Sequence, residues 1–128
     1  MGASRVGGFP LTMQGPGRVL IAGSFVTVGS GNPTNANRRG RGYTVVRTAA
    51  GRYTVTLNNA VVAFDSIVAT VAPETAGTAL VATIDEDSIT TSVFEIRVEN
   101  LSDALTDDAG SRVNFMAVAR TTNVSDPA

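Results

Sequence analysis

The feature that most constrains the fold is a two-residue alternation of apolar and polar side chains, which recurs from about residue 43 onward. Two threonines separate Tyr53, Val55 and Leu57, and Glu95 and Arg97 interrupt the apolar run 94–98 in the same way. A period of two places successive side chains on opposite faces of an extended strand. No segment of ten or more residues has apolar positions at helical spacing. The pattern therefore predicts an all-β protein.

Several such strands are expected, each bounded by turn-forming residues. Tyr43–Thr48 and the strand at 53–57 flank a short turn, Ala49–Arg52, that contains a glycine. This arrangement predicts a β-hairpin. Further strands are expected at 66–71, 80–84, 94–98 and 113–119. Many short strands separated by turns are typical of an antiparallel β-sandwich or jelly roll.

The first 41 residues have a different composition. Met1–Gly17 contains five glycines and two prolines, which is typical of an extended arm. Arg18–Val28 predicts one kinked strand or two short ones, because Gly23 interrupts it. Gly29–Gly42 predicts a long exposed loop. We divide the chain into an N-terminal arm, short strand and Arg-rich loop (1–41), a β-sandwich domain (42–122) and a C-terminal tail (123–128).

The sequence lacks several residue types on which enzymes depend. It has no His, the commonest general base, no Cys and no Lys, so zinc–thiolate sites, Walker phosphate loops and Schiff-base chemistry are excluded. A net charge of -1 argues against general nucleic-acid binding. No apolar run has the ~18 residues of a membrane-spanning helix, and no signal peptide is recognised. We predict a protein that is not an enzyme, has no cofactor, binds neither nucleic acid nor membrane, and stays where it is made until it joins an assembly.

Two acidic clusters are candidate metal or catalytic sites. One is Asp85–Asp87, and the other comprises Asp103, Asp107 and Asp108. Neither has the alternating acidic spacing with a central glycine that makes a calcium loop specific. A glycosidase built on paired carboxylates would need aromatic walls, and aromatic residues are only 5% of the chain. We interpret both clusters as solvated turns and predict no metal site and no catalytic residue.

The candidate binding residues lie in the N-terminal third. The arm has an apolar residue at every second position from Phe9 to Met13, which is unusual for a free tail. The arginine cluster at 38–41 could bind an acidic partner surface through its guanidinium groups, or it could be a solvated loop. The predicted capsid- or partner-binding residues are Arg5, Phe9, Leu11, Met13, Arg38, Arg39 and Arg41.

Some strands also carry apolar residues at the positions expected to face outward. These are Val68, Val81, Val93, Met116 and Val118. They could form a subunit interface, or a second sheet could cover them.

The region from Gly42 to Arg120 resembles the β-sandwich domains of tailed-bacteriophage virion proteins. The resemblance is carried by the stretch GRYTVTLNNAVVAFDSIVATVA and by the later stretch SVFEIRVENLSDALTDDAGSRVNFMAVAR. The second resembles the closing hairpin of such domains, whose last strand often has an F-x-A-V pattern. Phe115, Ala117 and Val118 match that pattern.

The resemblance implies a capsid decoration (cement) protein. Such a protein binds the outer surface of the virion shell as a homotrimer and stabilises contacts between subunits of the major capsid protein, its partner. It is assembled in the host cytoplasm, and its N-terminal arm often extends over the capsid lattice. The alternative is a receptor- or glycan-binding domain of a tail or head fibre. A cellular carbohydrate-binding module is disfavoured because the sequence has no Trp.

Overall fold

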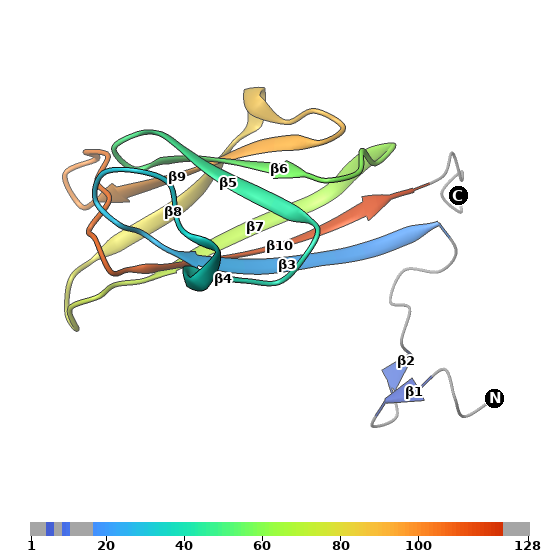
Figure 1. The fold of residues 1–128 in the computed structure, drawn as a ribbon, viewed down its shortest axis with the longest axis horizontal. Helices are drawn as coiled ribbons and strands as arrows, with labels where there is room; N and C mark the ends of the chain where they lie inside the picture. The colour runs from blue at the N-terminus through green and yellow to red at the C-terminus, as the bar shows by residue number, and fades with distance from the viewer. Residues whose placement is uncertain (1–4, 7–8, 11–16, 122–128) are drawn as a thin grey trace.

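The protein is a β-sandwich, seen here in a computed structural model that describes residues 5–6, 9–10 and 17–121. One sheet has the strand order β4-β3-β10-β7 and the other β5-β6-β9-β8, and every pairing is antiparallel. Figure 1 shows the two sheets as separate layers. The strands are β3 (Arg18–Val26), β4 (Arg38–Arg39), β5 (Tyr43–Ala49), β6 (Arg52–Leu57), β7 (Ala63–Ala72), β8 (Leu80–Asp85), β9 (Val93–Asn100) and β10 (Arg112–Arg120). The predicted antiparallel sandwich and the predicted hairpin at 43–57 are confirmed.

Four short elements of the described residues accompany the sandwich. β1 (Arg5–Val6) pairs with β2 (Phe9–Pro10) as a separate two-stranded sheet. The other two are the 3-10 turns η2 (Asn35–Asn37), before β4, and η3 (Glu86–Ser88), after β8. No helix in the described part of the chain is long and apolar enough to cross a membrane.

The core consists of the inward-facing residues of both sheets. Alternate positions of β6 and β10 are buried, as the period of two predicts, and β9 is buried at Phe94, Ile96 and Val98. Four aromatic contacts cross the core, including an edge-to-face pair of Tyr43 and Phe115 with ring centroids 4.9 Å apart. Because the aromatic rings and branched side chains interlock between the layers, the two sheets form one hydrophobic core.

The sandwich begins earlier in the sequence than residue 42. Arg18–Val26 lies in the segment assigned to the N-terminal arm, and it is a single strand that pairs with β10 over its whole length. The sequence left this region open because Gly23 interrupts it and its apolar residues do not alternate. In the structure Gly23 lies opposite Phe115, and the absence of a side chain leaves room for the ring of Tyr43.

Candidate interaction surface

The outer faces of the two sheets differ in character. Outward positions of the β5-β6-β9-β8 sheet are largely polar or charged, including Thr54, Thr56 and Thr83. Outward positions of β3, β10 and β7 include a group of apolar residues that lie side by side in the register of the strands. We call this group the apolar face, and its members are Leu20, Ala22, Val68, Met116 and Val118.

The register of the strands brings these five residues together from distant parts of the sequence. Met116 of β10 lies between Ala22 of β3 and Val68 of β7. In the next row, Val118 lies beside Leu20. Leu20 is 46% exposed, Val68 55% and Met116 46%, so no other part of the described chain covers them. A shallow hollow of about 160 Å³ lies between Val68 and Met116.

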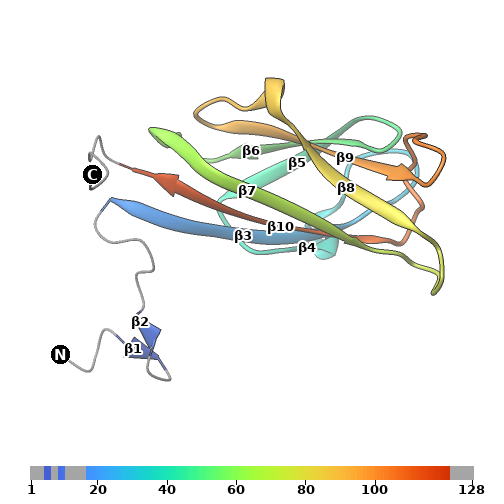
Figure 2. The ribbon, with the colours of Figure 1, turned by 180° about the vertical axis from the view of Figure 1, so that it is seen from behind.

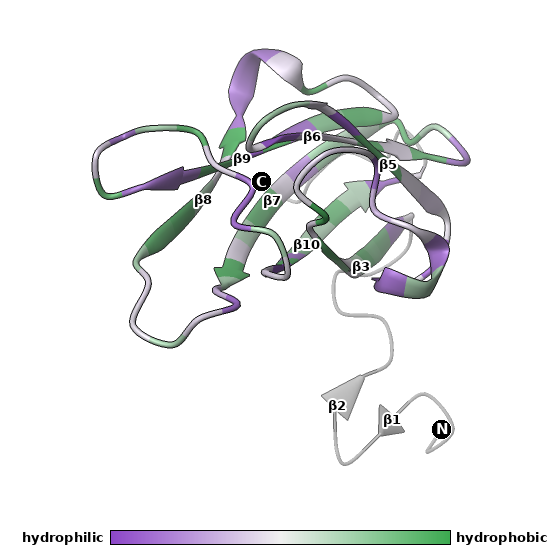
Figure 3. Cartoon of the chain, turned by 60° about the vertical axis from the view of Figure 1, so that its left-hand side comes forward, coloured by the Kyte–Doolittle hydropathy of each residue, from purple (hydrophilic) through white to green (hydrophobic). Residues whose placement is uncertain are grey.

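Polar side chains border the apolar face at both ends. At one end Asp65 accepts a hydrogen bond from Arg18 Nε at 3.0 Å and forms an ion pair with Arg120 Nε at 3.0 Å. At the other end Arg112 donates to the Ser24 hydroxyl at 2.8 Å. An apolar centre with a polar rim is the arrangement found in protein–protein interfaces. Figure 3 shows hydrophobic colour along much of β7 and β10.

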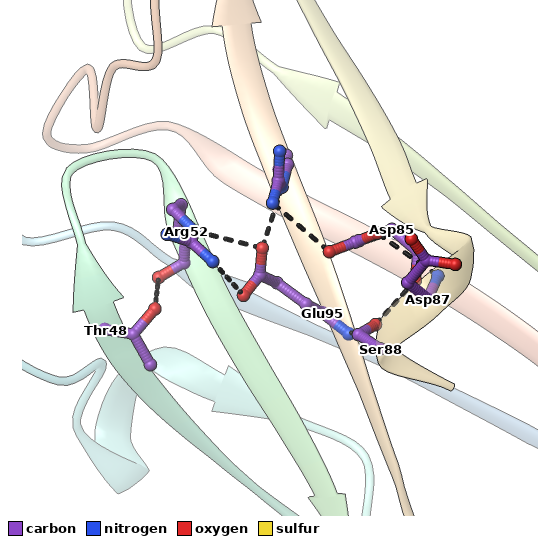
Figure 4. A network of polar contacts seen from close by, with 7 residues as sticks. Thr48, Arg52, Asp85, Asp87, Ser88 and Glu95 are labelled. Carbon is purple, nitrogen blue, oxygen red and sulfur yellow. Dashed lines mark hydrogen bonds and ion pairs between the residues drawn. The ribbon is translucent and has the colours of Figure 1, made fainter. Parts of the chain in front are cut away.

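The opposite outer face carries an ion-pair network instead. Both nitrogens of the Arg52 fork contact the Glu95 carboxylate at 3.1 Å, and Arg97 Nε contacts the same carboxylate at 2.8 Å. Arg97 also reaches Asp85 at 3.2 Å. Figure 4 shows Arg52, Glu95 and Asp85 in a row across the strands. Burial alone would raise the pKa of Glu95, but hydrogen bonds from the two arginines outweigh burial and hold that pKa below its ordinary value.

A second polar cluster closes one end of the sandwich around Asp107. Its carboxylate accepts hydrogen bonds from Arg47, from the backbone N–H of Gly51 at 2.9 Å and from the Tyr53 hydroxyl. Burial alone would raise the pKa of Asp107, yet these donors lower it to about 2. The sequence interpretation of Asp107 as a solvated turn residue is wrong, since only 8% of it is exposed. Its partners lie at residues 47–53, more than fifty positions earlier in the sequence, and no local pattern reveals contacts over that distance.

The predicted binding residues have different surroundings. Arg38 is turned toward its own domain: it donates to the Tyr43 carbonyl at 2.7 Å and to the Asn35 side chain, and its guanidinium lies 5.6 Å from the centre of the Tyr43 ring. Arg39 and Arg41 are exposed. Arg5 and Phe9 belong to β1 and β2, and Leu11 and Met13 lie outside the described residues.

Of the outward apolar residues named from the sequence, Val68, Met116 and Val118 share the apolar face. Val81 and Val93 belong to the other sheet, where Val81 is 50% exposed. Sequence reasoning did not include Leu20 and Ala22 in this surface, because the faces of β3 could not be assigned without its pairing to β10.

Among the residues that the structure describes, no group of three or more His, Cys, Asp or Glu side chains is placed to hold a metal ion. Asp85 instead accepts a hydrogen bond from the backbone of Asp87 and caps the short turn η3.

Comparison with known proteins found no family model, no curated protein and no solved structure that matches this sequence.

Proposed function

We propose that this chain is a structural protein of a tailed-bacteriophage virion, a decoration protein that binds the outer surface of the shell as a homotrimer. The observation that carries the proposal is the apolar face on the outside of the β4-β3-β10-β7 sheet. Exposed apolar residues gathered at the centre of a polar rim favour a surface that is buried on association. We assign this face to contact with the major capsid protein.

The placement of the aromatic residues favours decoration over glycan recognition. Glycan-binding surfaces commonly present exposed aromatic rings, whereas both tyrosines and three phenylalanines of this chain are buried in the core. Between residues 17 and 121, Phe64 is the only aromatic residue that is not buried. Little aromatic surface is therefore left in this range for a sugar-binding platform.

The proposal is tested with particles of the source virus produced without this protein. Purified wild-type chain should bind these particles, and Val68→Lys should weaken binding at least about tenfold, because it places a charge in the centre of the buried surface. Val81→Lys is the matched control. Val81 is also followed by Ala and Thr, lies on the other terminal strand and is 50% exposed, against 55% for Val68.

Val68→Lys and Val81→Lys should differ clearly in their affinity for the particles. Equal binding by Val68→Lys and wild type would reject the assignment of the face. The copy number of the chain in purified virions tests the wider proposal. A number comparable with that of the shell subunit is expected, and a small fraction of it would favour a fibre or tip protein instead.

A further inference from the structure

The two long sides of the sandwich are not equally closed. On the side of β4 and β5, the Tyr43 hydroxyl donates to the backbone carbonyl of Ser24, and Arg38 bonds back to β5. On the opposite side, β7 and β8 are the terminal strands of their sheets, and neither contains a fully buried residue. Their inward apolar residues are only half-buried, although they pack against the core. On the other side, by contrast, β5 has two buried residues, Tyr43 and Val45.

A groove lies where β7 and β8 diverge. The two strands are joined through residues 73–79 at one end and separate toward the other, where β7 begins and η3 follows β8 (Figure 2). The groove has a volume of about 340 Å³. Its lining is apolar at Phe64, Ile67, Ile84 and Ile89 and acidic at Asp65 and Glu86. Asp65 is already paired with two arginines, whereas no ion pair within residues 17–121 engages Glu86.

The strands on either side of the groove have open edges that can accept another strand. From Ser66 to Ala72, β7 contains no charged residue and no proline, and the same is true of Leu80–Ile84 in β8. Natural proteins usually guard exposed edges with charges, prolines or bulges. Beside the groove, β7 carries Asp65 and a register shift against β10, so the edge without such guards at the groove is that of β8. An unguarded edge beside a half-covered apolar surface is suited to strand addition, in which backbone bonds give affinity and alternate side chains fill the pocket.

The chain itself supplies a segment with matching chemistry. Phe9, Leu11 and Met13 are separated by Pro10 and Thr12, and Arg5 precedes them. β1 and β2 pair over only two residues each, and an isolated two-stranded hairpin is marginal in water unless a larger sheet supports it. The apolar alternation fits the lining of the groove, and the arginine is complementary to Glu86.

We infer that residues 5–13 of one copy bind in the β7–β8 groove of a neighbouring copy and add a strand to its open side. Each copy then offers one segment and one groove. Such a head-to-tail contact closes into a ring when the rotation between copies permits it. Only the number of copies in that ring depends on the proposed function, which assumes a homotrimer.

The first test measures the mass of the full-length protein by light scattering over a range of concentrations. Wild type should self-associate. Leu11→Asp should raise the dissociation constant at least about tenfold, since it places a charge in an apolar pocket. Thr12→Asp is the matched control, because it adds the same charge at a position that points to the opposite side of an extended strand. A wild-type protein that is monomeric throughout, or equal effects of both substitutions, would overturn the inference.

The second test asks whether the segment binds in its own copy or in a neighbour. Arg5→Glu and Glu86→Arg should each weaken association about threefold, as expected for an exposed ion pair. An equimolar mixture of the two variants should recover part of the lost association, since each can then supply what the other lacks. No recovery in the mixture, with recovery in the double variant, would place the segment in its own copy and reject the exchange. Glu74→Arg, in the connection that follows β7, is the charge control.

Neither test depends on shells or virions. Loss of shell binding by Val68→Lys with intact self-association would separate the proposed function from this inference, and the reverse result would do the same. Hydrogen exchange gives an independent readout: amides of β7 and β8 should gain protection as wild-type concentration rises, and those of β5 should not.

Discussion

The ring of Tyr43 occupies the space that a side chain at Gly23 would need. A Cβ at Gly23 would lie 2.5 Å from Tyr43 Cε1 and 2.5 Å from the hydroxyl oxygen. The ring is held in this position because its hydroxyl lies within hydrogen-bonding distance of the backbone carbonyls of Ser24 and Arg39, which share its one proton. Tyr43 thus joins the β5 edge of one sheet to the β3–β4 edge of the other.

Replacing Gly23 with Ala should lower the free energy of unfolding by about 1–3 kcal/mol, the usual cost of overpacking a core. The backbone of Gly23 does not have a positive φ, so the cost is steric. Urea unfolding measures it. In a Tyr43→Leu background the same substitution should cost much less, because the obstructing ring is gone. Equal costs in both backgrounds would show that the two residues are not coupled.

The carboxylate of Asp107 should be a strong determinant of stability. Asp107→Asn weakens the ion pair with Arg47 and disturbs the bonds from Gly51 and Tyr53 in a buried site. We expect a loss of about 3 kcal/mol, as for one partner removed from a buried pair. Asp87→Asn, in the exposed turn η3, should change stability by less than about 0.5 kcal/mol. Similar losses for both variants in thermal unfolding would contradict this role.

Acid should destabilise the protein through the same residue. The pKa of Asp107 is lowered from 3.8 to about 2, so the folded state holds the ionised form more firmly than the unfolded state. The resulting stability, about 2 kcal/mol, is fully present above pH 3.8 and is lost as the pH falls toward 2. Glu95, whose pKa is also lowered, adds to the same decline. The Asp107→Asn variant should show a shallower dependence on pH in this window, and an unchanged slope would reject the assignment.

High pH should destabilise the folded protein through Tyr43 and Tyr53. Burial raises the pKa of Tyr43 above its ordinary value of 10.0, and burial together with the hydrogen bond to Asp107 raises that of Tyr53. An unfolded chain loses these protons first, so stability is intact below pH 10.0 and falls above it. Because the sequence has no lysine, few other groups titrate there. Phenolate absorbance should therefore rise together with unfolding, detected by circular dichroism. A gradual rise near pH 10 in folded protein would contradict this prediction.

The sequence predicted the strands and the sandwich because alternation is a local property. Residues 53–57 and 94–98 alternate cleanly, and both segments are core strands. The membership of β3 in the sandwich depended on pairing with β10, some ninety residues later, which no local pattern records. For the same reason Val68 and Met116 could be named as outward-facing residues, whereas their place on one face with Leu20 and Ala22 could not. Asp107 looked like an ordinary turn residue because its partners are remote in sequence.

The first and last described residues of the sandwich domain, Gly17 and Thr121, are hydrogen-bonded to each other. The backbone N–H of Thr121 donates to the carbonyl of Gly17 at 2.6 Å, and the Thr121 hydroxyl bonds to the same oxygen at 3.1 Å. A domain whose chain ends are this close can be inserted into a surface loop of another protein without separating the two ends of that loop. By the same geometry, a protein fused after Thr121 would begin next to the segment that precedes Gly17.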